Sequence, residues 1–166
     1  ISTIKLGIMA EMFYRIEAGD LALADKVTIN KSDLRGGTGV FREFKTPVEV
    51  TLEDVCMMMI VVSDNTCTWI LGDMLGVKNI NERMRGLGLQ EYSLNSDLGP
   101  DMFEEFKESG KGVEAYSECS ARDFTRLVSL IANEELVSPA ASKRMLDMMG
   151  RCQHTEWLGR YLPLSP

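Results

Sequence analysis

The amino-acid sequence predicts a single, mostly α-helical domain over residues 1–166. The first observation is size, because 166 residues of which 45% are hydrophobic match the common size of one domain with one core. The second is periodicity, since apolar residues recur at three- and four-residue spacing through most of the chain. The third is the scarcity of strand patterns. Only residues 26–30 and 47–50 alternate, which allows at most a small two-stranded ribbon.

The first expected helix runs from about residue 3 to 18 and begins just after Ser2, because apolar residues recur there until a glycine stops the pattern. The second covers residues 52–62. It opens on Thr51 followed by Asp54, which resembles a capping box in which an aspartate replaces the more usual glutamate. Both helices are therefore predicted with a defined start.

The later helices are also marked by caps and glycines. They are expected at residues 66–75, at 79–85, after Ser120, and at 140–149 behind the cap and first-turn proline Ser138-Pro139. The stretch 90–118 has few periodic apolar residues and is long for a plain connection, so we expect a functional loop or an insertion there. Residues 157–166 form an apolar tail.

Composition excludes several classes of function. The chain has 18 Lys and Arg against 25 Asp and Glu, so its net charge is −7 and it offers no positive field to nucleic acid or to an anionic membrane surface. No apolar stretch approaches the roughly 18 residues of a membrane-spanning helix. No signal peptide is expected either, because no charged segment precedes an apolar one at the start of the chain. We expect neither nucleic acid nor a membrane span.

The cysteines and the single histidine do not predict a metal site. Cys56, Cys67, Cys119 and Cys152 include no Cys-x-x-Cys pair, and His154 cannot complete a zinc set of the usual spacing. Cys56 and Cys67 lie within apolar helical patterns, where reduced core thiols are favoured over a disulfide. No cofactor is expected.

A Ser-x-x-Lys element, Ser2 to Lys5, lies on the first turn of the first expected helix. One helical turn places the Ser2 hydroxyl and the Lys5 amine on the same face, where the amine can accept the serine proton. Burial would lower the pKa of the lysine toward that of a working base, and the helix N-terminus favours a developing negative charge. Chance occurrences of this spacing are common, and the simpler alternative is that Ser2 only caps the helix.

A second polar element, Ser63-Asp64-Asn65, lies where one apolar helix ends and the next begins. It supplies a hydroxyl, a carboxylate and a carboxamide at a corner that can point into a cleft. The alternative is a plain turn in which Asp64 or Ser63 caps the following helix.

Together, the two elements carry a family resemblance. A Ser-x-x-Lys on a helix start, followed after 63 − 2 = 61 residues by Ser-Asp-Asn between two helices, resembles the class A serine β-lactamases and the related penicillin-binding proteins. Further segments agree with class A in the same order: Gly37-Thr38-Gly39-Val40, Leu52-x-Asp54, Ile60 to Thr66, and Arg160 to Pro163. The resemblance implies the helical domain of the α+β serine β-lactamase/transpeptidase-like fold.

The resemblance also implies roles for matching residues. Ser2 would be the acylated nucleophile, with its backbone N–H as an oxyanion donor, and Lys5 its proton acceptor. Ser63 would relay a proton toward the β-lactam or peptide nitrogen, and Asn65 would orient Lys5 and the acylamide of the substrate. Asp64 is expected to be structural. The family further implies a small-molecule β-lactam or a peptidoglycan stem peptide as substrate, and a periplasmic or secreted location.

Two features depart from the family pattern. No Lys-Thr-Gly element occurs, since Lys45-Thr46-Pro47 lies too early and its proline cannot donate from a strand. We therefore expect the sheet-forming flanks to lie outside these residues, the isolated chain to show little turnover, and an apolar helix face to be uncovered.

The second departure is Glu91-Tyr-Ser-Leu94-Asn95, which matches the family's deacylating Glu-x-x-Leu-Asn element but lies only 91 − 63 = 28 residues past Ser63. Glu91 is thus either the deacylating base or a solvated turn residue. The sequence favours a hydrolase that is acylated by β-lactams at Ser2. The alternatives are a D-alanyl-D-alanine peptidase or transpeptidase and a catalytically silent helical module.

Overall fold

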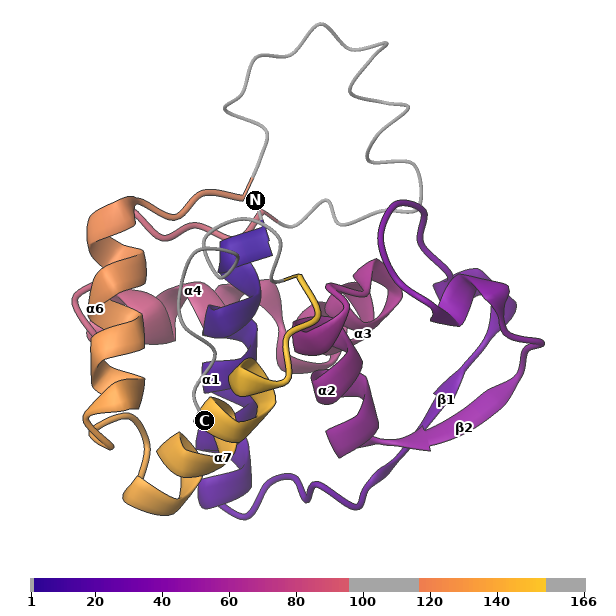
Figure 1. The fold of residues 1–166 in the computed structure, drawn as a ribbon, viewed down its shortest axis with the longest axis horizontal. Helices are drawn as coiled ribbons and strands as arrows, with labels where there is room; N and C mark the ends of the chain where they lie inside the picture. The colour runs from indigo at the N-terminus through magenta and orange to yellow at the C-terminus, as the bar shows by residue number, and fades with distance from the viewer. Residues whose placement is uncertain (1, 96–116, 155–166) are drawn as a thin grey trace, which may run out of the picture.

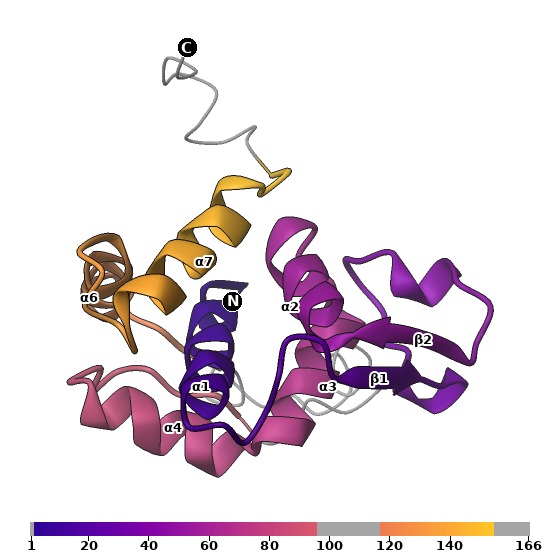
Figure 2. The same ribbon diagram turned by 90° about the horizontal axis from the view of Figure 1, so that it is seen from below.

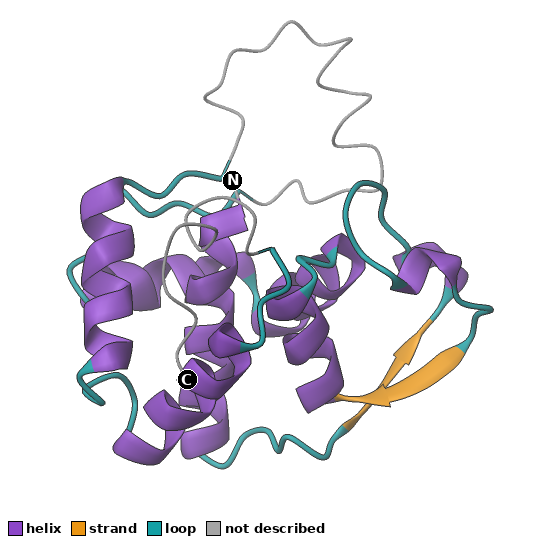
Figure 3. Cartoon of the chain, viewed as in Figure 1, coloured by secondary structure: helices purple, strands orange, loops and turns teal. Residues whose placement is uncertain are grey.

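The structure is a computed structural model in which residues 2–95 and 117–154 are described. Its elements are the 3-10 turn Ser2–Ile4, α1 Lys5–Glu17, β1 Lys26–Ile29, β2 Val48–Thr51, α2 Leu52–Val61, α3 Asn65–Leu75, α4 Val77–Gly86, α6 Ala121–Ala132 and α7 Pro139–Gly150. Helices dominate the described residues, as predicted, and the strands form one small ribbon (Figures 1 and 3).

Helix α1 is the centre of the fold. It contacts α2, α3, α4 and α7, and Figure 2 shows it between α4 on one side and α7 on the other. Residues 4–13 are buried without interruption. A helix that is enclosed on all sides needs apolar residues around its whole circumference, which explains why its pattern is dense rather than one-sided. The Ser-x-x-Lys element lies at its N-terminal end, with Ser2 in the preceding 3-10 turn and Lys5 as the first residue of α1.

The start of α1 differs from the simple capping alternative. The N-cap position of α1 is Ile4, which makes no side-chain capping hydrogen bond, and Ser2 lies two residues earlier, at the start of the 3-10 segment. Tyr92 buttresses this turn, because its hydroxyl donates to the Ile4 carbonyl at 2.7 Å. A Cβ at Gly7 would come within 3.0 Å of the Tyr92 ring, so only glycine lets the ring approach.

The corner between α2 and α3 follows its local sequence. Thr51 and Asp54 form the predicted capping box at the start of α2, with the Asp54 N–H donating to Thr51 Oγ1 at 3.1 Å and the Thr51 N–H donating to Asp54 Oδ2 at 3.0 Å. Asp64 caps α3, because its Oδ1 accepts the Cys67 N–H at 3.1 Å. The capping interpretation of Asp64 is therefore confirmed.

The two strands form an antiparallel ribbon in which Lys26 pairs with Thr51 and Ile29 with Val48. The predicted strands 26–30 and 47–50 are found with ends shifted by about one residue. The ribbon projects at the opposite end of the molecule from α6 (Figures 1 and 2). The connection between its strands runs back toward the start of α3.

The remaining caps also follow the sequence. The Ser120 hydroxyl accepts the Asp123 N–H at 3.2 Å ahead of α6, and the Ser138 hydroxyl accepts the Ala141 N–H at 3.3 Å ahead of α7. Of the expected loop 90–118, residues 96–116 lie outside the described residues, as do the tail 157–166 and its Arg160 to Pro163 match. The two described ends of the loop meet in an antiparallel bridge, Ser93 with Glu118.

The helices of the described residues are too short or too polar to cross a membrane. Cys56 and Cys67 are buried in the core without a disulfide, as expected for core thiols. Burial raises the pKa of the Cys56 thiol to about 12 and that of Cys67 further, so both stay protonated at neutral pH.

Candidate active site

The structure brings the two polar elements together. Ser2 and Lys5 lie at the start of α1, whereas Ser63 and Asn65 lie at the corner between α2 and α3. The Ser2 and Ser63 hydroxyl oxygens are 3.0 Å apart, and either can donate. The Lys5 amine donates to Ser63 Oγ at 2.8 Å and to Asn65 Oδ1 at 3.2 Å. All four side chains predicted as site residues therefore belong to one hydrogen-bonded cluster, while their catalytic roles stay predictions.

The cluster has a definite order. Among the described residues, no hydrogen bond joins Ser2 Oγ directly to Lys5 Nζ. Instead the path runs from Ser2 Oγ to Ser63 Oγ and from there to Lys5 Nζ. A proton that leaves Ser2 can thus reach the amine through the hydroxyl of Ser63, which both accepts and donates.

Lys5 is unusual for a lysine because only 5% of it is exposed. Burial lowers its pKa from 10.5 to about 8, while the negative charge of Asp64 opposes that change. At pH 7 this value leaves roughly a tenth of the lysine as neutral amine, whereas an exposed lysine would hold well under a thousandth. The amine is therefore available as a base near neutral pH.

Ser63 adopts a strained backbone. Its φ is 57°, in the left-handed region that costs a non-glycine residue roughly 1–2 kcal/mol. Its carbonyl oxygen accepts two hydrogen bonds, from Lys5 Nζ at 2.6 Å and from Thr38 Oγ1 at 2.7 Å. The strain is therefore located at the residue whose hydroxyl joins Ser2 to Lys5.

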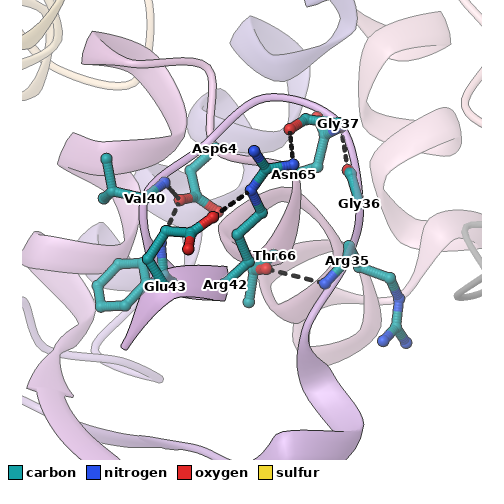
Figure 4. A network of polar contacts seen from close by, with 10 residues as sticks. Arg35, Gly36, Gly37, Val40, Arg42, Glu43, Asp64, Asn65 and Thr66 are labelled. Carbon is teal, nitrogen blue, oxygen red and sulfur yellow. Dashed lines mark hydrogen bonds and ion pairs between the residues drawn. The ribbon is translucent and has the colours of Figure 1, made fainter. Parts of the chain in front are cut away.

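Asp64 anchors the loop that faces this corner (Figure 4). Its carboxylate is buried, and Oδ2 accepts the backbone N–H groups of Val40 at 2.6 Å and Phe41 at 3.0 Å. The loop comes so close that a Cβ at Gly39, where φ is 130°, would overlap the carboxylate. The expected structural role of Asp64 thus includes holding residues 36–41 against α3.

Asn65 connects the same loop to Lys5. Its side-chain Nδ2 donates to the Gly36 carbonyl at 2.9 Å (Figure 4). This leaves Oδ1 to accept from the Lys5 amine. Its backbone N–H donates to the Thr38 carbonyl at 3.0 Å. The sequence marks the segment Gly37-Thr38-Gly39-Val40 only as a family match, which predicts no contact for Thr38. Its dense glycines, beside one hydroxyl residue, were the available signal.

Glu91 and Lys45 are exposed and do not belong to the hydrogen-bonded cluster of Ser2, Lys5, Ser63 and Asn65. Glu91 is an exposed turn residue whose backbone N–H donates to Asp123 Oδ2 at 2.6 Å. Within residues 2–95 and 117–154, its carboxylate makes no hydrogen bond to Ser2, Lys5 or Ser63. Lys45 is exposed beside the ribbon. No group of three His, Cys, Asp or Glu side chains in the described part of the chain could hold a metal ion.

The chain is similar to known proteins in both sequence and structure. The sequence matches a family model described as the beta-lactamase enzyme family over residues 1–165. None of the curated proteins compared with the chain matches it.

Solved structures are similar over nearly the whole chain. A β-lactamase from Sphaerobacter thermophilus is 26% identical with a TM-score of 0.88 over 99% of this chain and 59% of its own. A PBP-A mutant in an acyl-enzyme complex with penicillin G is 27% identical with a TM-score of 0.83 over 98% of this chain and 57% of its own. A β-lactamase from Chitinophaga pinensis, 22% identical, shares the fold with a TM-score of 0.84 over 99% of this chain and 60% of its own. The chain thus spans about three fifths of each, and the predicted helical portion of this fold is confirmed.

Proposed function

Because the chain belongs to the beta-lactamase enzyme family, we propose that it carries the acylating residues of a serine hydrolase that reacts with β-lactams. In this proposal residues 1–166 are one helical domain, and Ser2, Lys5, Ser63 and Asn65 are its catalytic residues. The observation that carries the proposal is the continuous path from Ser2 Oγ through Ser63 Oγ to Lys5 Nζ, with steps of 3.0 and 2.8 Å. These lengths lie within the reach of proton transfer.

Acylation begins when Ser2 Oγ attacks the carbonyl carbon of the β-lactam. Its proton moves to Ser63 Oγ as the Ser63 proton moves to the neutral Lys5 amine. The negative charge on the carbonyl oxygen is stabilised by the Ser2 backbone N–H and by the ammonium that has just formed. The carbon–nitrogen bond of the lactam then breaks, Ser63 donates a proton to the nitrogen, and Lys5 returns a proton to Ser63. Ser2 is left as an ester.

Asn65 has two tasks in this mechanism. Its Oδ1 accepts from Lys5 and keeps the amine directed at Ser63, because the Nδ2 bond to Gly36 prevents the amide from turning over. Its second task, contact with the acylamide of the substrate, is carried over from the family resemblance. A β-lactam and a D-alanyl-D-alanine peptide present the same amide carbonyl to Ser2, so both are substrate candidates.

The exposed Glu91 favours a second candidate function, that of a penicillin-binding peptidase or transpeptidase. Fast hydrolysis of the Ser2 ester needs a carboxylate that holds a water against the ester carbon. Among the described residues, Glu91 has no contact that fixes its carboxylate near Ser2. If no other carboxylate of the whole protein takes this place, the acyl-enzyme lasts longer, as expected of a penicillin-binding protein.

Intact-mass measurement after incubation with benzylpenicillin tests the proposal. We expect a covalent adduct on the chain, located by peptide mapping on Ser2, and none on Ser2→Ala. The matched control is Ser129→Ala, which removes an exposed hydroxyl on α6 and should leave adduct formation unchanged. A lasting adduct supports the penicillin-binding function, and an adduct that clears supports a β-lactamase. No adduct after hours at millimolar penicillin would overturn acylation and favour a silent module.

A further inference from the structure

The loop residue Thr38 has a hydroxyl contact that neither the fold nor the proposed mechanism uses. Its Oγ1 donates to the Ser63 carbonyl oxygen at 2.7 Å, and the same oxygen accepts from Lys5 Nζ at 2.6 Å. The Thr38 carbonyl also accepts the Asn65 N–H at 3.0 Å. One loop residue therefore contacts both residues of the corner that touch the lysine.

We propose that Thr38 is a positioning residue: its hydroxyl holds the Ser63 carbonyl, and through that oxygen it places the Lys5 amine and limits how strongly the ammonium form is held. This inference rests on the proposed function, in which Lys5 must lose its proton before Ser2 can be acylated. It names a residue outside the four that carry the reaction.

The first part of the argument is geometric. The direction of the Ser63 carbonyl depends on a strained backbone with φ of 57°, and no regular helix or strand fixes it. Thr38 lies 25 residues earlier, in the loop that Asp64 anchors through Val40 and Phe41. A hydroxyl on that anchored loop can hold the carbonyl in the one direction that also serves Lys5.

The second part is electrostatic. A carbonyl oxygen has two lone pairs, and here one accepts from the Thr38 hydroxyl and the other from the Lys5 ammonium. The positive end of the hydroxyl dipole points at the oxygen to which the ammonium donates its shortest hydrogen bond. Without that hydroxyl the oxygen would interact more strongly with the ammonium, so the pKa of Lys5 would rise.

Few charged groups act on the pKa of Lys5, so the dipole of one hydroxyl can change it. Burial lowers the pKa of Lys5, and among the described residues the carboxylate of Asp64, at the cap of α3, is the main group that raises it. The charged residues of the loop face other partners: Arg35 lies over the Trp69 ring and Arg42 pairs with Glu43. The groups that determine the pKa of Lys5 therefore lie next to the Ser63 carbonyl.

The experiment compares Thr38→Val and Thr38→Ser in the 166-residue chain. Valine keeps the shape of threonine but removes the donor, and serine restores it. The matched control is Thr125→Val on α6, which removes a hydroxyl that also donates to a backbone carbonyl at 2.7 Å, that of Ala121, away from the site. Two quantities are measured against pH: the NMR titration of the Lys5 side chain, and the rate at which benzylpenicillin acylates the chain.

For Thr38→Val we expect the Lys5 titration to move up by roughly half a pH unit. The acid limb of the acylation profile should move with it, so that acylation slows about threefold below the limb and is unchanged above it. Thr38→Ser should restore wild-type values, and Thr125→Val should change neither.

A Lys5 titration that stays in place would overturn the inference, as would a Thr38→Val rate that falls equally at every pH. The NMR titration does not depend on reaction with penicillin. If wild type forms no adduct, the proposed function fails while the titration still decides the role of Thr38.

Discussion

Replacing Lys5 by methionine should remove a pH-dependent loss of stability that the buried amine causes. The pKa of Lys5 falls from 10.5 in the unfolded chain to about 8 in the folded one, so between these values the unfolded state binds more protons. Stability must then rise with pH across this window. A difference of about 2.5 pKa units corresponds to roughly 3 kcal/mol. The free energy of unfolding is lower by this amount below pH 8, and the loss is recovered by about pH 10.5.

The assay is urea unfolding of wild type and Lys5→Met at several pH values between 7 and 11. The difference in free energy of unfolding, wild type minus Lys5→Met, should increase by roughly 3 kcal/mol from pH 7 to pH 11, whatever its value at pH 7. Comparing the two chains cancels the titration of groups that do not interact with Lys5. The control is Lys78→Met on α4, because the Lys78 side chain is 85% exposed and folding changes its hydration little. A wild-type minus Lys5→Met difference that stays constant with pH would refute the reasoning.

Two further predictions concern the carboxylates. Asp64→Asn should lower the free energy of unfolding by about 3 kcal/mol, because a buried charged acceptor of three backbone N–H groups is replaced by an amide. In urea unfolding the control Asp73→Asn, an exposed position on the same helix, should change little, and a loss under about 1 kcal/mol for Asp64→Asn would contradict the anchor. Glu91→Gln should leave acylation and deacylation by benzylpenicillin within about twofold of wild type, since its side chain is exposed in a turn. An acyl-enzyme trapped by this substitution, seen by mass spectrometry, would instead make Glu91 the base.

Much of the fold could be predicted because its helices begin at residues that act locally. Thr51, Ser120 and Ser138 each accept a hydrogen bond from the N–H three residues later, as their sequence positions predict. Such contacts depend on neighbours in the chain, so a sequence pattern suffices. The same holds for Asp64, whose capping contact with Cys67 was one of the two interpretations of its motif.

The arrangement within the site could be predicted only in part. The family resemblance named Ser2, Lys5, Ser63 and Asn65 and gave Lys5 as the acceptor of the Ser2 proton. It did not show that the hydrogen-bonded contact between Ser2 and Lys5 runs through the Ser63 hydroxyl. That route depends on the left-handed backbone of Ser63. Serine as a residue type does not favour a positive φ, so the sequence does not predict this conformation and only the structure shows it.

The role of Thr38 was hidden for a related reason. Its hydroxyl meets a carbonyl 25 residues later, and backbone carbonyls are present at every position, so no residue type marks the acceptor. Gly39 was the nearest signal, because a residue without a side chain indicates that two segments approach closely. A glycine in the sequence does not say which segment comes close or which group makes the contact.

In this proposal Asp64 raises the pKa of Lys5 and Thr38 lowers it, so an experiment can distinguish their roles. The Asp64 charge raises the pKa of the buried amine, so Asp64→Asn should move the acid limb of acylation to lower pH. Thr38→Val should move it to higher pH, because it removes a dipole that opposes the ammonium. Both residues also hold the same loop and corner, so a purely mechanical role would slow both variants without moving either limb. Opposite shifts therefore require that the pKa of Lys5 near 8 is set by the balance of this carboxylate, this hydroxyl and burial.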